Sequence, residues 1–135
     1  MIDKSPNDTT SNTSRRILVI EDNVDSAEVL QTFLELNGHE IVVAYNTADG
    51  MQAAQQMIPE VIICDISLAG TLDGYDAAEE IRRHEKLKST FLIALSGYGR
   101  PEDKEKAKAA GFDEHLTKPT DFDLLIRLLN NLDSI

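Results

Sequence analysis

Short apolar runs alternate with amphipathic segments along this chain. The runs at 17–20, 61–64 and 91–95 are apolar at every position, which is typical of strands buried on both faces of a parallel sheet. Two less regular segments, 40–44 and 112–116, predict further strands. Apolar residues at helical spacing predict helices between and after them, over 25–36, 47–57, 75–87, 101–110 and 121–132. Five alternations of strand and helix predict a doubly wound α/β fold with a five-stranded parallel sheet.

Two of the predicted helices carry apolar faces of unusual width. The helix 101–110 offers only alanines to bury, so we expect it to be the least firmly packed. The helix 25–36 has more apolar residues than one buried face needs, Val29 and Leu36 among them. The excess is either part of the core or an exposed surface on which a helical partner docks. At the helix starts, Asn23 or Asp22 can cap 25–36 and Thr120 can cap 121–132.

Length and composition indicate one soluble domain. The chain has 135 residues, enough for a single core. Residues 1–14 are polar and rich in Ser, Thr and Asn, so we expect a disordered tail followed by a domain over 15–133. The single cysteine, Cys64, lies inside an apolar run and is expected to be buried. We expect a cytoplasmic protein with no membrane insertion.

Charge is strongly negative and unevenly distributed. The formal net charge is -11, which argues against nucleic acid as a partner because few cations are available to replace phosphate counterions. No Lys or Arg occurs between Ile17 and Ile81, whereas basic residues follow closely from Arg82 onward. One side of the molecule should therefore be negative, a field suited to divalent cations and to partner discrimination. His39 and His84 have no metal-ligand spacing around them and are expected at the surface.

Chemically distinctive side chains follow four of the predicted strands. Glu21 and Asp22 follow the first strand and Asp65 follows the run VIIC, while Ser96 and Lys118 follow the last two strands. From its own strand alone, Asp65 could equally cap the next turn. Because the carboxyl ends of parallel strands share one edge of a sheet, we expect all five side chains to converge there.

The predicted cluster has the composition of a magnesium and phosphoryl site. Three carboxylates repel one another unless a cation lies between them, and hard oxygen ligands suit Mg²⁺. Lys118 and Ser96 supply a cation and a hydrogen-bond donor for phosphoryl oxygens. Asp65 is then the natural nucleophile.

This arrangement resembles the receiver domain of two-component response regulators over Arg15 to about Leu132. The resemblance rests on several pieces in the correct order, namely Glu21-Asp22, Asp65 after VIIC, Asp73-Gly74, Ser96 within ALSGYG, and Lys118-Pro119. It implies a flavodoxin-like (βα)5 fold with strand order 2-1-3-4-5. It also implies that Asp65 accepts a phosphoryl group from a phosphohistidine of a histidine kinase or phosphotransfer protein.

The same resemblance assigns roles to individual residues. Glu21, Asp22, Asp65 and the backbone carbonyl of Ser67 would hold Mg²⁺, and Ser96 and Lys118 would bind the phosphoryl group. The Lys118-Pro119 bond would be cis. The chain would be a phosphoacceptor that promotes its own phosphorylation and dephosphorylation, not an enzyme with a separate substrate. We expect no output domain after Leu132, and we therefore expect signalling through protein contacts or onward phosphorelay.

The sequence departs from the family pattern at two places. The segment after Asp65 has Ala69 in the usual proline position and is one residue longer than the common form. His115 stands where the family usually has an aromatic residue that moves with Ser96 on activation, so it either takes over that switch or weakens it.

Three other classes of protein are weighed against this interpretation. A pseudo-receiver would keep the fold as a protein-binding module without phosphorylation. A haloacid-dehalogenase-like phosphatase would need a second acid where this chain has Ser67. A flavin-binding flavodoxin-like protein would need a phosphate loop where this chain has Glu21-Asp22-Asn23, whose charges repel phosphate.

Overall fold

The fold is described from a computed structural model that covers residues 14–66, 74–97 and 99–132. Five parallel strands form one sheet in the order β2-β1-β3-β4-β5, which confirms the predicted topology. The elements follow one another as β1 (Arg16–Ile20), α2 (Val24–Leu36), β2 (Glu40–Ala44), α3 (Thr47–Met57), β3 (Val61–Asp65), α4 (Gly74–Arg83), β4 (Phe91–Ser96), α5 (Pro101–Ala110), β5 (Glu114–Thr117) and α6 (Phe122–Asn130).

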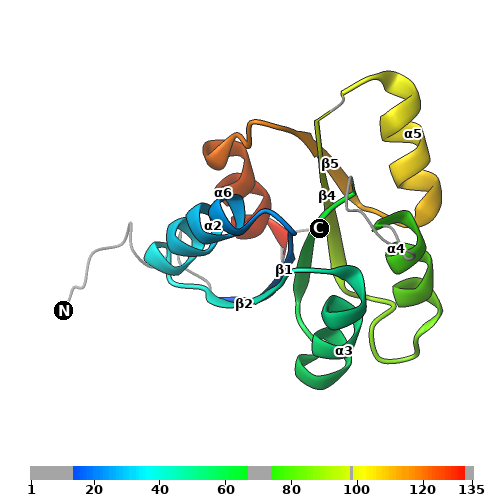
Figure 1. The fold of residues 1–135 in the computed structure, drawn as a ribbon, viewed down its shortest axis with the longest axis horizontal. Helices are drawn as coiled ribbons and strands as arrows, with labels where there is room; N and C mark the ends of the chain where they lie inside the picture. Colours follow the sequence, from blue (N-terminus) through cyan, green and yellow to red (C-terminus); the bar gives the residue numbers. More distant parts are fainter. Residues whose placement is uncertain (1–13, 67–73, 98, 133–135) are drawn as a thin grey trace.

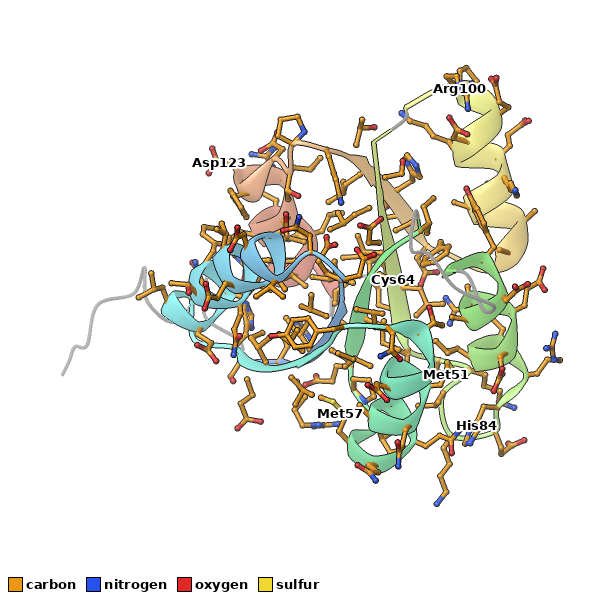
Figure 2. All side chains as sticks on the ribbon, viewed as in Figure 1. Met51, Met57, Cys64, His84, Arg100 and Asp123 are labelled. Atoms are coloured by element: carbon orange, nitrogen blue, oxygen red, sulfur yellow. The ribbon has the colours of Figure 1, made fainter. Side chains whose placement is uncertain are left out.

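Helices cover both faces of the sheet. Helices α2 and α6 lie on one face and α3, α4 and α5 on the other (Figure 1). Each face buries its own apolar cluster, one around Leu34 and Leu125 and the other around Leu18 and Ile81. The central strand β3 is buried along its whole length, and Cys64 lies within it at the middle of the molecule (Figure 2). The continuous apolar runs are therefore explained by burial on both sides.

The predicted disordered tail 1–14 lies outside the described residues except for Ser14, which is exposed. The predicted domain 15–133 stays a prediction, and the structure describes it as far as Leu132 with residues 67–73 and 98 left out. None of the helices in that part is long and apolar enough to cross a membrane.

The helix α4 is shorter than predicted. It ends at Arg83 and not at Leu87. The guanidinium of Arg82 donates hydrogen bonds to the backbone carbonyl oxygens of Lys88 (2.9 Å) and Thr90 (2.7 Å), which hold a compact turn in place of another helical turn. Leu87 is nevertheless fully buried. Leu87 is at helical spacing and is buried in the core, but it lies in the turn after α4, so the spacing of apolar residues predicted too long a helix.

The start of β5 and the cap of α6 also differ from the prediction. The strand β5 begins at Glu114, because Phe112 lies just past the end of α5 and its backbone N–H closes the last turn of that helix. The cap of α6 is Asp121, whose carboxylate accepts a hydrogen bond from the backbone N–H of Leu124 (3.1 Å), and not Thr120. The predicted cap Asn23 of α2 is confirmed.

Two predictions about helix faces can be judged directly. In α2, Leu30 and Leu34 are buried, whereas Val29 is 56% exposed and Leu36 is 82% exposed. The interpretation of this stripe as entirely core is therefore wrong. The helix α5 buries only Ala107 and Ala110, as its sequence indicates.

The expectation that His39 lies at the surface is wrong. Its ring is 5% exposed, and Nδ1 accepts a hydrogen bond from the backbone N–H of Arg15 (3.1 Å). Burial lowers the pKa of His39, and the positive charge of Arg15 lowers it further, although Glu60 acts in the opposite direction. Arg15 is itself buried, and its Nε donates to the carbonyl oxygen of Leu129 (2.9 Å).

His39 should make stability depend on pH below 6.5, the ordinary pKa of histidine. In the unfolded chain His39 takes up a proton near that pH, whereas the folded state resists protonation until the pH is lower. The free energy of unfolding should therefore be complete above pH 6.5 and fall as the pH drops toward the lowered pKa. His39→Asn, which keeps an acceptor for the Arg15 N–H, should flatten this slope in urea titrations. His84→Asn is the matched control and should keep the wild-type slope; an unchanged slope in H39N would contradict the prediction.

Candidate functional site

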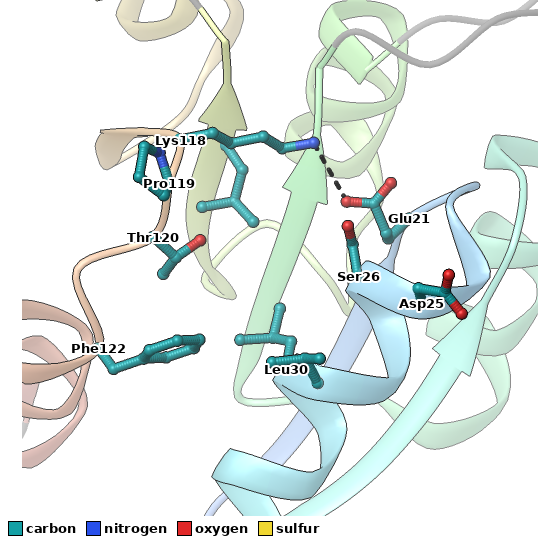
Figure 3. Close-up of a pocket in the computed structure, with 10 residues that line it drawn as sticks. Glu21, Asp25, Ser26, Leu30, Lys118, Pro119, Thr120 and Phe122 are labelled. Atoms are coloured by element: carbon teal, nitrogen blue, oxygen red, sulfur yellow. Dashed lines mark hydrogen bonds and ion pairs between the residues drawn. The ribbon is translucent and has the colours of Figure 1, made fainter.

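The carboxyl edge of the sheet holds two buried carboxylates joined by one ammonium group. Glu21 and Asp65 are each 3% exposed. The Nζ of Lys118 lies 2.7 Å from Oδ2 of Asp65 and 3.3 Å from Oε1 of Glu21. Figure 3 shows Lys118 reaching across the edge toward Glu21. Side chains from β1, β3 and the end of β5 are thus brought together, as their positions after the strands predict.

Backbone hydrogen bonds hold these groups in place. The N–H of Glu21 donates to the carbonyl oxygen of Ala44 (3.0 Å), and the N–H of Asn23 donates to Oε2 of Glu21 (3.0 Å). On the other side, the N–H of Lys118 donates to the carbonyl oxygen of Ser96 (2.7 Å). The Lys118-Pro119 peptide bond is cis, as the resemblance implies. Hydrogen bonds therefore fix the backbone of Glu21 and of Lys118.

The acids at this edge can serve a divalent cation. One carboxylate oxygen from each of Glu21, Asp22 and Asp65 lies within 4.8 Å of the other two. Three carboxylates and the single ammonium of Lys118 leave two formal negative charges without compensation among these four side chains. Mg²⁺ prefers hard oxygen ligands and commonly uses one or two carboxylates together with water and phosphate oxygens. The donor set and its charge therefore fit Mg²⁺.

Burial and neighbouring charges shift the pKa values of Glu21 and Lys118. Burial raises the pKa of Glu21; the N–H of Asn23 works against this shift, and the charge of Asp65 adds to it. Burial alone would lower the pKa of Lys118, but its hydrogen bond to Asp65 and the charges of Asp65 and Glu21 raise it above its usual value. Lys118 is therefore a permanent cation at this edge, and the carboxylates gain from any further positive charge.

Ser96 and His115 form a second pair beside the cluster. The Oγ of Ser96, which is 3% exposed, lies 2.9 Å from Nε2 of His115. Burial lowers the pKa of His115, and the charge of Lys104 on α5 lowers it further, while Asp103 and the backbone carbonyl of His115 act against the shift. The predicted partners Ser96 and His115 are thus in direct contact. Ser67, Ala69 and the lengthened segment lie outside the described residues.

A groove lies beside the acidic cluster, and its shape was not predicted from the sequence. It runs between the start of α2 and the chain from Lys118 to Phe122 (Figure 3). It has a volume of about 590 Å³, and Val29 and Leu30 line its apolar side. A second hollow of about 490 Å³ continues along α2 to Leu36 and shares Val29 and Phe122 with the first. The wide apolar stripe of α2 was the only sequence signal for it.

Comparisons with known proteins agree on one family. The family model described as the response regulator receiver domain matches residues 17–130. Protein PilH of Pseudomonas aeruginosa is 30% identical over 115 residues, which are 85% of this chain and 94% of PilH. A 14.6 kDa protein encoded in the sodA1 3' region of Leptolyngbya boryana is 33% identical over 113 residues, 84% of this chain and 86% of that protein.

Two solved structures share the fold. The receiver domain of the sensor histidine kinase PA1611 from Pseudomonas aeruginosa, with a magnesium ion coordinated in its active site cleft, has a TM-score of 0.82 and 28% identity, covering 91% of this chain and 100% of that one. The receiver domain of Ssk1 from Saccharomyces cerevisiae, crystallised with the histidine phosphotransfer protein Ypd1, has a TM-score of 0.79 and 26% identity, covering 86% of each chain.

Magnesium should stabilise the folded chain, because the three carboxylates come together only after folding. At ten times the dissociation constant, the free energy of unfolding should rise by about 1.4 kcal/mol. Asp22→Asn removes one ligand and should raise the Mg²⁺ concentration needed for this effect at least about tenfold. Urea unfolding at a series of Mg²⁺ concentrations measures both. Asp25→Asn, an exposed acid on the next turn, is the control; a D22N response equal to that of D25N would contradict the metal site.

Proposed function

The chain belongs to the family of response regulator receiver domains, and on that premise we propose that it accepts a phosphoryl group on Asp65 from a phosphohistidine of a histidine kinase or phosphotransfer protein. The observation that supports this most strongly is the contact of the buried Asp65 carboxylate with Lys118 inside the three-carboxylate cluster. If Asp65 only capped the following turn, it would need neither Lys118 nor the other carboxylates beside it. We therefore take Asp65 as the nucleophile.

The transfer exchanges one phosphorus bond for another. A carboxylate oxygen of Asp65 attacks phosphorus and forms a P–O bond, while the P–N bond to the donor imidazole breaks and its electron pair returns to the nitrogen. The ammonium of Lys118 and the hydroxyl of Ser96 would bind the phosphoryl oxygens and stabilise their charge. Mg²⁺ held by Glu21, Asp22 and Asp65 would neutralise further charge on those oxygens. The backbone carbonyl of Ser67 is proposed as a further ligand from the resemblance alone.

The donor is proposed to dock in the groove along α2. The groove begins at Lys118 and Glu21 and continues past Val29, which is exposed, so a helix seated in it would bring its histidine to the cluster. The receiver domain of Ssk1 crystallised with Ypd1 supports a phosphotransfer protein as the kind of donor. Asp25 and Glu28 border the groove. A donor with basic residues around an apolar centre would fit this surface best.

The output is proposed to be a protein contact or onward phosphorelay from the aspartyl phosphate. In this view the chain promotes its own phosphorylation and dephosphorylation and has no separate substrate. A cytoplasmic location suits the single buried thiol of Cys64 and a kinase donor. The alternative function is a pseudo-receiver that binds partners without phosphorylation.

Acetyl phosphate with Mg²⁺ should phosphorylate the wild type at one position, measured by intact mass and peptide mapping. Asp65→Asn should stay unlabelled, because an amide oxygen does not form the acyl phosphate. Asp25→Asn, a surface acid beside the groove, is the control and should label like the wild type. Equal labelling of D65N and wild type would contradict the assignment, and no labelling of the wild type would favour the pseudo-receiver.

Val29→Asp should slow phosphotransfer from a protein donor by about tenfold, because it places a charge in the apolar centre of the groove. The probe is any phosphohistidine phosphotransfer protein that labels the wild type, with rates read by loss of donor label. Labelling by acetyl phosphate should be unchanged. Val42→Asp on β2, where the valine is 42% exposed away from the groove, is the matched control. Equal losses in V29D and V42D would count against docking on α2.

A further inference from the structure

His115 contacts Ser96 on one face of the sheet. Strand β5 pairs with β4 so that Ala94 lies opposite His115 and Ser96 opposite Thr117. Because side chains alternate along a strand, Ser96 and His115 are diagonal neighbours on the same face. The 2.9 Å bond between Oγ and Nε2 is thus built into the register of two adjacent strands.

The other ring nitrogen of His115, Nδ1, is buried and makes no hydrogen bond of acceptable geometry with any group of the described residues. Its own backbone carbonyl acts on the ring and raises the pKa, but the two do not form such a bond. A neutral imidazole carries its proton on one nitrogen only. A proton on Nδ1 would be a buried donor without a well-aligned acceptor among the described residues, which folded proteins rarely tolerate, whereas an unused lone pair is tolerated more often. The proton of neutral His115 therefore belongs on Nε2.

Charges around the ring favour the neutral form. Lys104 and Asp103 of α5 face it with opposite effects on its pKa, and burial together with Lys104 prevails in lowering that pKa. Lys104 and Lys108 also line a hollow of about 280 Å³ beside the ring, together with Asp113 and Glu114. At neutral pH the imidazole is therefore uncharged, and its Nε2–H donates to the Oγ of Ser96.

We propose that His115 is a positioning residue that donates from Nε2 to Ser96 and so directs the Ser96 O–H toward the phosphoryl site. A hydroxyl has one proton and can also accept. When Ser96 accepts from His115, its own proton is not used in that bond and can be donated to a phosphoryl oxygen on Asp65. In this chain of two hydrogen bonds, Ser96 accepts from His115 and donates to the phosphoryl oxygen, so each bond polarises and strengthens the other.

The proposal rests on the proposed function, because it assumes that Ser96 binds a phosphoryl group. The direction of the bond does not depend on that assumption. In the opposite arrangement, with the proton on Nδ1, Ser96 would spend its only proton on His115 and could not donate to the phosphoryl group. His115 would then oppose phosphoryl binding and not support it.

Long-range ¹H–¹⁵N NMR spectra at neutral pH decide the direction of the bond. We expect a protonated Nε2 and a bare Nδ1 for His115. His39 is an internal reference, because its Nδ1 accepts the N–H of Arg15 and must be bare when the ring is neutral. A protonated Nδ1 on His115 would overturn the proposal.

Binding of beryllium fluoride, an inorganic mimic of the phosphoryl group, with Mg²⁺ tests the consequence. His115→Phe keeps a ring but removes the donor and should weaken binding by about fivefold. His115→Gln offers an amide N–H at the same reach from the backbone and should bind within about twofold of the wild type. Thermal unfolding confirms that both variants are folded. Wild-type affinity in H115F, or affinity in H115Q as weak as in H115F, would overturn the proposal. No binding by the wild type itself would instead defeat the proposed function, and the NMR spectra alone would then judge the direction of the bond.

Discussion

The ammonium of Lys118 between Glu21 and Asp65 is the interaction on which the edge of this molecule depends. Two carboxylates at 3% exposure would be costly to ionise without a cation in contact. Lys118 provides that cation at 2.7 Å and 3.3 Å. Because its ammonium is shared, neither carboxylate is fully neutralised, and Asp22 adds a third negative group. The uncompensated negative charge destabilises the folded state at this edge, and the same charge favours the binding of a divalent cation.

The parallel sheet is what brings these groups together. The acids follow β1 and β3, and Lys118 comes just after the end of β5, so residues nearly one hundred positions apart meet at one edge. In an antiparallel sheet, neighbouring strands would end at opposite edges, and these side chains would not meet. The two helical layers then present different surfaces. On one face, α2 leaves Val29 exposed beside the cluster and Leu36 exposed at its far end, and on the other, α5 is anchored by Ala107 and Ala110.

The sequence predicted the features that depend on local pattern and on the rule for parallel strands. The five strands and the meeting of Glu21, Asp65 and Lys118 needed no knowledge of tertiary contacts, whereas the order of the strands came from the resemblance to receiver domains. The errors lie where distant residues decide. The burial of His39 depends on Arg15 beside it, and the end of α4 depends on Arg82 reaching the turn after it. The groove could not be predicted as a shape, because it forms between α2 and the chain before α6.

The contact between Ser96 and His115 links the acidic edge of the sheet to helix α5. Ser96 ends β4 at the acidic edge, where its backbone carbonyl already receives the N–H of Lys118, and its hydroxyl meets His115 beneath α5. A charge that forms at Asp65 would act on Ser96 through Lys118. It would reach α5 through His115, because Lys104 of α5 faces the imidazole of His115. The helix at that point buries two alanines. Little apolar contact would therefore need to be broken for α5 to move in response to a change at Ser96.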